Sequence, residues 1–240
     1  MDKLRILAFG AHPDDVELGC GGILARHAAA GDAVGIVDLT LGQMGTRGTV
    51  QGRLKEAGAA SGILGLRLRE NLEMEDGLFE NDHAHRLKVI QALRRHRPDI
   101  VLCNAPHDRH PDHGRAAALV LESCFYAGLA KIHTEDKDGA AQQPWRPKTV
   151  FHYIQFYDLK PDLLVDISDF FDLKMESILA HSSQFYDPAS TEPGTLIASP
   201  EFLDHIRFRA ANFGLTIGVK YAEGLIAART PGLKSLNDIL

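Results

Sequence analysis

The stretch of sequence that decides the fold is residues 4–40, LRILAFGAHPDDVELGCGGILARHAAAGDAVGIVDLT. Its apolar opening at residues 4–10 predicts a buried strand, and the small and apolar residues at 19–31 predict a helix that ends at Gly31. DAVGIVDLT at residues 32–40 predicts a second strand. A strand, a helix and a further strand in this order predict a parallel pair joined by a crossover helix.

The same alternation recurs along the chain. After a glycine-rich loop at 42–52, helices are predicted at 53–65, 83–96, 114–128, 170–181 and 199–214, and strands at 68–72, 99–104, 149–156 and 163–168. The last helix is expected to stop at Gly214. Residues 131–147 are polar and contain two prolines, which predicts an exposed insertion or flap. The sequence therefore predicts one Rossmann-like α/β domain over residues 1–240, with a mostly parallel sheet and helices on both faces.

The composition is that of a soluble globular protein, because 45% of the 240 residues are hydrophobic, 24% are charged and the net charge is -6. This charge argues against a broad attraction to nucleic acid or to an anionic membrane. No window reaches the ~18 apolar residues of a membrane span, and the N-terminal residues lack a signal-peptide pattern, which predicts a cytoplasmic protein. The three cysteines are widely spaced and odd in number, which indicates reduced thiols.

Two segments rich in histidine and aspartate each follow a predicted strand. They are AHPDD at residues 11–15 and HDRHPDHG at residues 107–114. Ligands of a doubly wound sheet collect outside the carboxyl ends of its strands. A catalytic zinc takes three protein ligands from histidines and carboxylates, and His12, Asp15 and His113 fit that pattern.

Asp14 is adjacent to a proposed ligand, so its side chain should point elsewhere and can act as the general base that activates water. The alternative is that each His-Pro-Asp is only a turn, in which proline sets the backbone and aspartate caps the next helix. For a single tripeptide the turn is the better interpretation. Two of them, extended to HPDD and HPDH, favour the metal site, because capping requires neither the histidines nor the doubled acid.

The two blocks resemble the motifs of the LmbE-like, or PIG-L, family of zinc de-N-acetylases, which carry AHPDD near the N-terminus and HPDH in mid-chain. The resemblance implies three zinc ligands, which are His12, Asp15 and His113. It also implies that Asp14 is the base, that protonated His110 stabilises the tetrahedral intermediate, and that Asp112 orients or tunes a histidine. Whether Asp14 or His110 protonates the departing nitrogen stays open.

Further segments are similar to the bacillithiol-biosynthesis deacetylases of the BshB type, which remove acetate from N-acetylglucosaminyl malate. They are LTLGQMGTRGT, RENL, EDGLF, CNAPHDRHPDHG, HSSQFYDP and GVKYAEG. Malate adds two carboxylates, which guanidinium groups bind through paired hydrogen bonds. Three arginines on or beside the predicted loops are candidates, namely Arg47, Arg53 and Arg109.

Each of these arginines has a plainer interpretation as a solvated surface charge, and Arg53 as the helix partner of Glu56. Arg109, inside the second motif, is the best candidate of the three. The chain also departs from the related loop at Gln43, where a glutamate is usual, so an acid-dependent contact from that position is in doubt.

Other interpretations stay open. The same chemistry suits another N-acetylglucosamine conjugate or an N-acetylated small molecule as substrate. A non-catalytic sugar- or nucleotide-binding module would use the aspartates as caps and ribose contacts, but HPDDVELGCGG stands where such a module carries GxGxxG. Two imidazoles and a carboxylate also suit ferrous iron in place of zinc. The resemblance further implies a homo-oligomer, a trimer or a hexamer.

Overall fold

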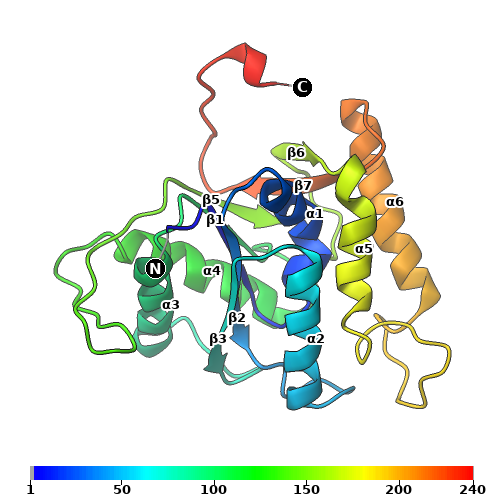
Figure 1. The fold of residues 1–240 in the computed structure, drawn as a ribbon, viewed down its shortest axis with the longest axis horizontal. Helices are drawn as coiled ribbons and strands as arrows, with labels where there is room; N and C mark the ends of the chain where they lie inside the picture. The colour runs from blue at the N-terminus through cyan, green and yellow to red at the C-terminus, as the bar shows by residue number, and fades with distance from the viewer. Residues whose placement is uncertain (1–2, 240) are drawn as a thin grey trace.

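A seven-stranded sheet forms the centre of the protein, seen in a computed structural model that describes residues 3–239 (Figure 1). The strands are β1 (Ile6–Gly10), β2 (Val34–Thr40), β3 (Leu68–Met74), β4 (Ile100–Cys103), β5 (Thr149–Tyr153), β6 (Leu163–Asp166) and β7 (Ala222–Ala227). Their order is β3-β2-β1-β4-β5-β7-β6. The first five strands pair in parallel, while β7 runs antiparallel to both of its neighbours. The predicted mostly parallel sheet is confirmed.

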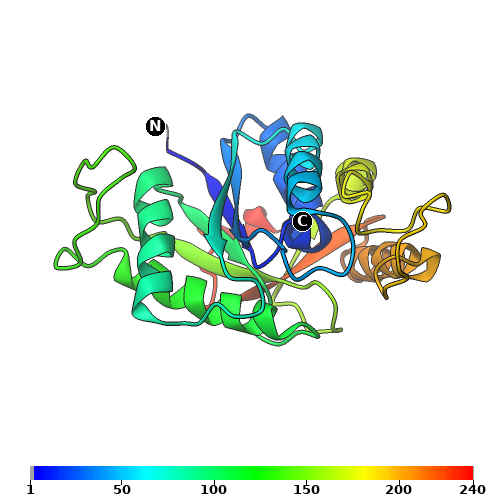
Figure 2. The ribbon, with the colours of Figure 1, turned by 90° about the horizontal axis from the view of Figure 1, so that it is seen from below.

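Helices cover both faces of this sheet (Figure 2). They are α1 (Asp15–Ala29), α2 (Val50–Ile63), α3 (His83–His96), α4 (Pro111–Tyr126), α5 (Phe171–Leu179) and α6 (Pro200–Ile217), with 3-10 turns η1 (Ser168–Phe170) and η2 (Leu236–Asp238). Alternate residues of a strand point to opposite faces. In β1, Leu7 and Phe9 accordingly pack in the apolar cluster that contains α3 and α4, while Ile6 and Ala8 pack in the one that contains α1 and α5.

Two details of the sequence interpretation are corrected by the structure. Strand β7 is absent from the predicted strands, because its short sequence AEGLIA carries a charged residue, Glu223, in its interior. The expected helix stop at Gly214 is wrong, since α6 continues to Ile217 and ends at Gly218, which has the left-handed φ of 76°. Gly214 instead allows close packing, because a Cβ there would lie 2.7 Å from the carbonyl oxygens of Val219 and Lys220.

Residues 131–147 form no helix or strand, apart from an isolated bridge between Glu135 and Ala141. They are nevertheless tied to α3, because the buried guanidinium of Arg94 donates hydrogen bonds to the Ile132 carbonyl at 2.7 Å and to the Thr134 hydroxyl at 2.8 Å. The segment is therefore an irregular connection between α4 and β5 that is anchored on its neighbour.

Helix α1 is broken at Cys20, and a buried ion pair fills the break. The Glu223 carboxylate accepts hydrogen bonds from the backbone N–H groups of Gly22 and Ile23, which the break leaves without intrahelical partners. The Lys174 ammonium donates to the Leu18 carbonyl at 2.8 Å and to Glu223. This arrangement holds the first turns of α1, which start at the HPDD loop. No helix among residues 3–239 is long and apolar enough to cross a bilayer.

Candidate active site

The two histidine- and aspartate-rich loops meet at the carboxyl ends of β1 and β4. His113 Nε2 lies 3.1 Å from Asp15 Oδ1, and His12 Nδ1 lies 3.5 Å from Asp15 Oδ2. The ring centroids of His12 and His113 are 5.6 Å apart. Residues about a hundred positions apart in the chain thus present two imidazole nitrogens and a carboxylate to one another.

The second nitrogen of each imidazole faces a carboxylate. His113 Nδ1 lies 2.7 Å from Asp108 Oδ2. His12 Nε2 lies 3.0 Å from Asp76 Oδ1 and 3.3 Å from Asp112 Oδ2. Carboxylates behind metal-binding histidines fix the ring and its tautomer, which leaves the other nitrogen for the ion.

The donor set fits a divalent cation. Among the described residues, two groupings have donor atoms that all lie within 4.8 Å of one another, namely His12 with His110 and His113, and His12 with Asp76 and Asp112. The Asp15 carboxylate is in neither grouping, but its oxygens lie 3.5 Å from His12 Nδ1 and 3.1 Å from His113 Nε2. Two imidazoles and one carboxylate with further positions open are the protein ligands of many catalytic zinc sites. Asp76 and Asp108 were missed by the sequence interpretation, although EDGLF and HDRHPDHG contain them.

Amide groups at the ends of neighbouring strands hold the Asp15 carboxylate. Asn104 Nδ2 donates to Asp15 Oδ2 at 3.0 Å, Gln155 Nε2 donates to Oδ1 at 2.6 Å, and the His12 backbone N–H donates to Oδ2 at 2.9 Å. Burial opposes ionisation of Asp15, but the charge of His113 and hydrogen bonds from both imidazoles hold its pKa well below the usual range. Asn104 follows β4 directly and Gln155 lies two residues after β5, and this position near a strand end is the one signal that the sequence offered for them.

Asp14 has a strained backbone and does not cap α1. Its φ is 130° and its ψ is -24°, and its side chain makes no capping hydrogen bond. Such a conformation is costly for a residue with a side chain and is concentrated at functional sites. Burial raises the pKa of Asp14 to about 6, with the charge of Arg53 acting in the opposite direction. The helix-cap interpretation of HPDD is therefore not supported.

A chain of buried charges lies behind Asp14. The Arg69 guanidinium donates to Glu17 Oε1 at 2.6 Å and to both Asp38 oxygens, and His181 Nε2 lies 3.1 Å from Glu17 Oε1. Burial opposes ionisation of Glu17, yet the Arg69 charge lowers its pKa to about 2. Through Glu17, these contacts tie the first turn of α1 to Arg69 of β3 and to His181 after α5.

His110 caps α4 with its ring. Its Nδ1 accepts a hydrogen bond from the Asp112 backbone N–H at 3.2 Å, so the ring proton resides on Nε2. Burial and the charges of His12 and His113 lower the pKa of His110. This geometry corresponds to a neutral imidazole that donates through Nε2, whereas the family resemblance implies a protonated ring. The histidine that Asp112 contacts is His12, not His110.

The three candidate arginines lie around one cleft but differ in what they contact. Arg47 donates to the Ser183 carbonyl and the Ser190 hydroxyl, which ties down the loop after α5. Arg53 is buried and donates to the carbonyls of Gly42 and Pro13, with its Nη2 3.4 Å from Asp14 Oδ2.

Arg109 is exposed and lies over the Phe156 ring, 5.0 Å from the ring centroid. Among residues 3–239, its guanidinium donates no hydrogen bond to any other group. Of the three arginines, Arg109 is thus the one whose donors are available to a ligand.

The cleft has a volume of about 460 Å³ and contains the candidate metal ligands together with Asp14 and His110. Pockets of this size hold small molecules. Its further walls come from residues 44–47, 155–156 and 195–197. Gln43 lies just outside, where its Nε2 donates to the Met74 carbonyl at 3.1 Å, a bond that a glutamate cannot make.

Comparisons with known proteins identify the family of this chain. The family model described as GlcNAc-PI de-N-acetylase, or PIG-L, matches residues 7–124. The diacetylchitobiose deacetylase of Thermococcus kodakarensis is 31% identical in an alignment 236 positions long, which covers 93% of this chain and 83% of that protein. The probable N-acetyl-alpha-D-glucosaminyl L-malate deacetylase 2 of Bacillus cereus is 27% identical in an alignment 204 positions long, which covers 75% of this chain and 83% of that protein.

The crystal structure of the conserved protein TT1542 from Thermus thermophilus superimposes with a TM-score of 0.85 at 38% identity, covering 97% of this chain and 98% of that one. The fold and the relatives together define an α/β protein of the de-N-acetylase class. The chain belongs to the PIG-L family of GlcNAc-PI de-N-acetylases. The narrower similarity to the BshB type, predicted from the sequence, stays a prediction.

Proposed function

We propose that the protein is a metal-dependent N-deacetylase that hydrolyses the acetamide of an N-acetylglucosamine-type conjugate. The single observation that carries this proposal is the convergence of His12, Asp15 and His113 beside a strained, buried Asp14 in one cleft. A binding module without catalysis has no use for a second acid held in a costly conformation next to a candidate metal site.

His12, Asp15 and His113 would hold the ion, with zinc as the preferred candidate and ferrous iron as the alternative. When bound there, a divalent cation polarises an amide carbonyl and acidifies water. Asp108 and the pair Asp76 and Asp112 keep the two imidazoles oriented for this purpose.

Asp14 accepts the proton of the attacking water, and its pKa of about 6 matches a general base that works near neutral pH. The Nε2–H of His110 donates a hydrogen bond to the carbonyl oxygen as negative charge develops on it. Asp14 then returns the proton to the amide nitrogen as the C–N bond breaks. The products are acetate and a free amine.

The substrate that we propose is chosen from the contacts of Arg109. Its guanidinium is exposed at the cleft and free of hydrogen bonds to the described residues, which suits a carboxylate on the group attached to the sugar. N-acetylglucosaminyl malate has such carboxylates and is the candidate we prefer. Diacetylchitobiose, on which the Thermococcus relative is named to act, is uncharged and is the second candidate.

The decisive experiment measures acetate release from N-acetylglucosaminyl malate, diacetylchitobiose and N-acetylglucosamine. We expect turnover of the malate conjugate to exceed that of free N-acetylglucosamine, and Arg109→Gln to raise KM for the malate conjugate about tenfold with little change in kcat. Arg146→Gln is the matched control, because Arg146 is also exposed and lies over a phenylalanine, Phe125, away from the cleft.

A preference for diacetylchitobiose that Arg109→Gln leaves unchanged would move the assignment to the uncharged disaccharide. Failure of the metal-loaded protein to release acetate from any of the three would contradict the deacetylase proposal.

A further inference from the structure

The segment between α5 and α6, residues 181–199, forms part of the wall of the catalytic cleft. It contains no helix or strand, and we call it the wall segment. Thr195, Leu196 and Ile197 line the cleft, and Leu196 is 53% exposed. A segment without regular structure has no backbone ladder of its own, so its shape depends on the groups that neighbouring elements offer to it.

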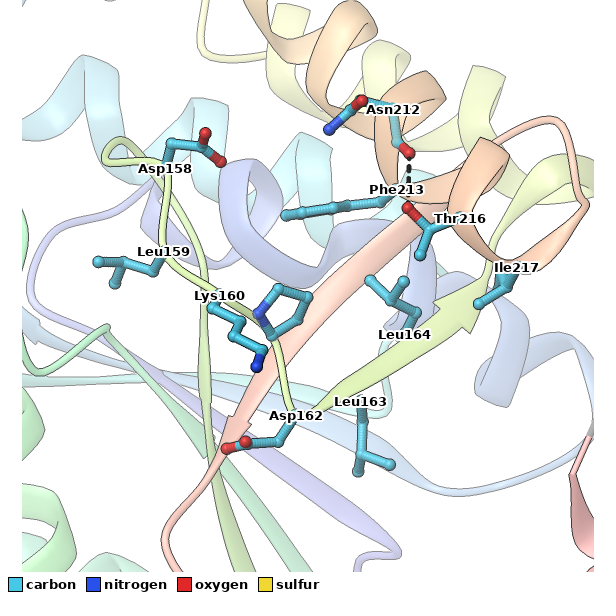
Figure 3. Close-up of a pocket in the computed structure, with 11 residues that line it drawn as sticks. Asp158, Leu159, Lys160, Asp162, Leu163, Leu164, Asn212, Phe213, Thr216 and Ile217 are labelled. Atoms are coloured by element: carbon cyan, nitrogen blue, oxygen red, sulfur yellow. Dashed lines mark hydrogen bonds between the residues drawn. The ribbon is translucent and has the colours of Figure 1, made fainter.

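Both ends of the wall segment are fixed by apolar packing. Ile178 of α5, Phe185 and Phe202 of α6 belong to one apolar cluster. Farther along, α6 packs on β6 and β7, where Phe213 lines a separate cavity of about 580 Å³ (Figure 3). Among residues 3–239, none of those that line the catalytic cleft lines that cavity. The helices therefore hold the two ends, and residues 186–197 between them require another support.

That support comes from Arg47, a buried residue of the glycine-rich loop before α2. Its guanidinium contacts three separate parts of the wall segment. Nε donates to the Ser183 carbonyl at 2.8 Å, Nη2 donates to the Ser190 hydroxyl at 2.9 Å, and Nη1 donates to the Pro193 carbonyl at 3.4 Å. A guanidinium presents its donors in a rigid plane, so this one side chain fixes the relative positions of all three acceptors.

The backbone beside the Arg47 guanidinium adds further contacts. The Arg47 carbonyl accepts a hydrogen bond from Gln184 Nε2 at 2.9 Å, and the Gly48 N–H donates to Glu192 Oε2 at 3.0 Å. Gly48 has a left-handed φ of 74°, and a Cβ there would lie 2.6 Å from Ser183 Oγ. Glycine thus permits the close approach of this loop to the wall segment.

The wall segment borders the part of the cleft where Arg109 lies. Ile197 and Phe156 both pack against the apolar cluster that contains Phe202, and the rings of Phe156 and Phe202 are stacked with their centroids 6.3 Å apart. Arg109 lies over the Phe156 ring. The group attached to the sugar, which the proposed function places at Arg109, therefore lies beside residues 195–197.

We propose that Arg47 is a positioning residue that fixes residues 195–197 against the group attached to the sugar, and so sets how tightly a conjugate binds. This inference rests on the proposed function, because it takes a conjugate of N-acetylglucosamine as the substrate. Arg47 acts through the wall segment, since its guanidinium donates to residues 183, 190 and 193.

Steady-state kinetics of Arg47→Gln test the proposal. The substrate is whichever conjugate the wild type hydrolyses faster, N-acetylglucosaminyl malate or diacetylchitobiose. We expect KM for it to rise about fivefold and kcat to change less than about twofold, because the lost wall contacts weaken the ground state and the transition state alike. KM for free N-acetylglucosamine, which lacks the attached group, should rise less than about twofold. Arg47→Lys retains a cation with fewer placed donors and should give an intermediate KM.

Arg94→Gln is the matched control. Arg94 is 4% exposed and Arg47 is 6% exposed, and Arg94 likewise donates to carbonyls of an irregular segment, those of Leu129 and Ile132. That segment does not line the cleft. Arg94→Gln should lose stability in urea denaturation as Arg47→Gln does, but keep the wild-type KM. An unchanged KM in Arg47→Gln, or an equal rise of KM in Arg94→Gln, overturns the proposal.

Ser190→Ala distinguishes support of the wall from direct contact between Arg47 and the substrate. It removes one acceptor of Arg47 and leaves the guanidinium in place, and Ser190 is exposed outside the cleft lining. KM for the conjugate should rise about two- to threefold. If KM rises in Arg47→Gln but not in Ser190→Ala, Arg47 binds the substrate itself and the proposal is wrong.

Hydrogen exchange provides a measurement that does not require turnover. It is made in the Asp14→Asn background with the conjugate that the wild type turns over fastest, or with N-acetylglucosaminyl malate if it turns over none. The conjugate should slow amide exchange at residues 195–197, and Arg47→Gln should abolish the slowing. Unchanged exchange at residues 195–197 overturns the proposal. If exchange at residues 107–114 slows nevertheless, the proposed function survives that failure, and if it does not, the proposed substrate class fails as well.

Discussion

The two His-Pro-Asp segments have the same three residues in front of a helix and adopt different structures. In the second, His110 caps α4 through its ring, Pro111 occupies the first turn and Asp112 lies inside the helix. In the first, Asp14 occupies the cap position of α1 with a φ of 130° and no capping hydrogen bond. The tripeptide itself therefore decides neither geometry.

The difference arises from the residue that comes directly after each tripeptide. Asp15 turns its carboxylate back to the His12 N–H and to the amides of Asn104 and Gln155, so the first loop is organised around that carboxylate. The second loop has His113 at the corresponding place, and His113 points across to Asp15. The first loop therefore contains the strained backbone and the acid, both at Asp14. The second loop is a regular helix start that contributes the imidazoles of His110 and His113.

The largest predicted loss of metal and turnover is at His113, the residue of the second loop that faces Asp15 of the first. His113→Ala removes an imidazole that faces Asp15, so metal stoichiometry should fall to near zero and turnover to background. Elemental analysis of the purified protein measures the first and acetate release the second. His107→Ala, an exposed histidine of the same segment, should leave both intact. Full metal content in His113→Ala would refute its place among the ligands.

Asp14 should have the next largest effect, and only on turnover. Asp14→Asn keeps the shape of the side chain but cannot accept a proton, so turnover should drop ~10²–10⁴-fold while metal content stays at the wild-type level. Assays of acetate release and elemental analysis, run on the same preparation, distinguish a general base from a metal ligand. Loss of metal in Asp14→Asn would mean that the two adjacent aspartates share the ion, and unchanged turnover would remove Asp14 as the base.

A smaller effect is expected at Asp112, which contacts His12 from the other loop. Asp112→Asn weakens the contact that orients the His12 ring, so metal affinity or turnover should fall ~10–100-fold. Competition with a chelator reports the affinity. Asp204→Asn, at an exposed position on α6, is the control. If Asp112→Asn binds metal as tightly as the wild type and keeps full turnover, the proposed support of one loop by the other is wrong.

The smallest effect concerns backbone strain in the first loop. Both Asp14→Gly and Asp14→Ala remove the carboxylate, but only glycine adopts a φ of 130° without strain. We expect the free energy of unfolding of Asp14→Gly to be about 1 kcal/mol larger than that of Asp14→Ala. At most positions inside helices or strands the alanine variant is the more stable one. Urea denaturation of both variants measures it. An alanine variant as stable as the glycine variant would show that the loop relaxes without cost.

Local patterns in the sequence determined most elements of this protein. Strand β1, helix α3 and the alternation of strand and helix follow from apolar periodicity and from turn residues near one another in the chain, and the parallel sheet follows from their order. Strand β7 and the continuation of α6 through Gly214 could not be predicted, because the charge of Glu223 is balanced by Lys174 and the glycine is required by a neighbouring turn.

For the site, the sequence by itself determined which motifs carry histidine and aspartate. The structure places His12 Nδ1 and His113 Nε2 within 3.5 Å of the Asp15 carboxylate, and their role as metal ligands stays a prediction. Only the tertiary structure decided that the carboxylates of Asp76 and Asp108 contact the imidazoles of His12 and His113. It also decided that Arg47 and Arg53 donate hydrogen bonds to backbone carbonyls, whereas the Arg109 guanidinium donates none to the described residues. The physical reason is distance along the chain. A motif reports on neighbours within a few residues, whereas the partner of a buried or ionised side chain comes from whichever strand or loop the fold places against it.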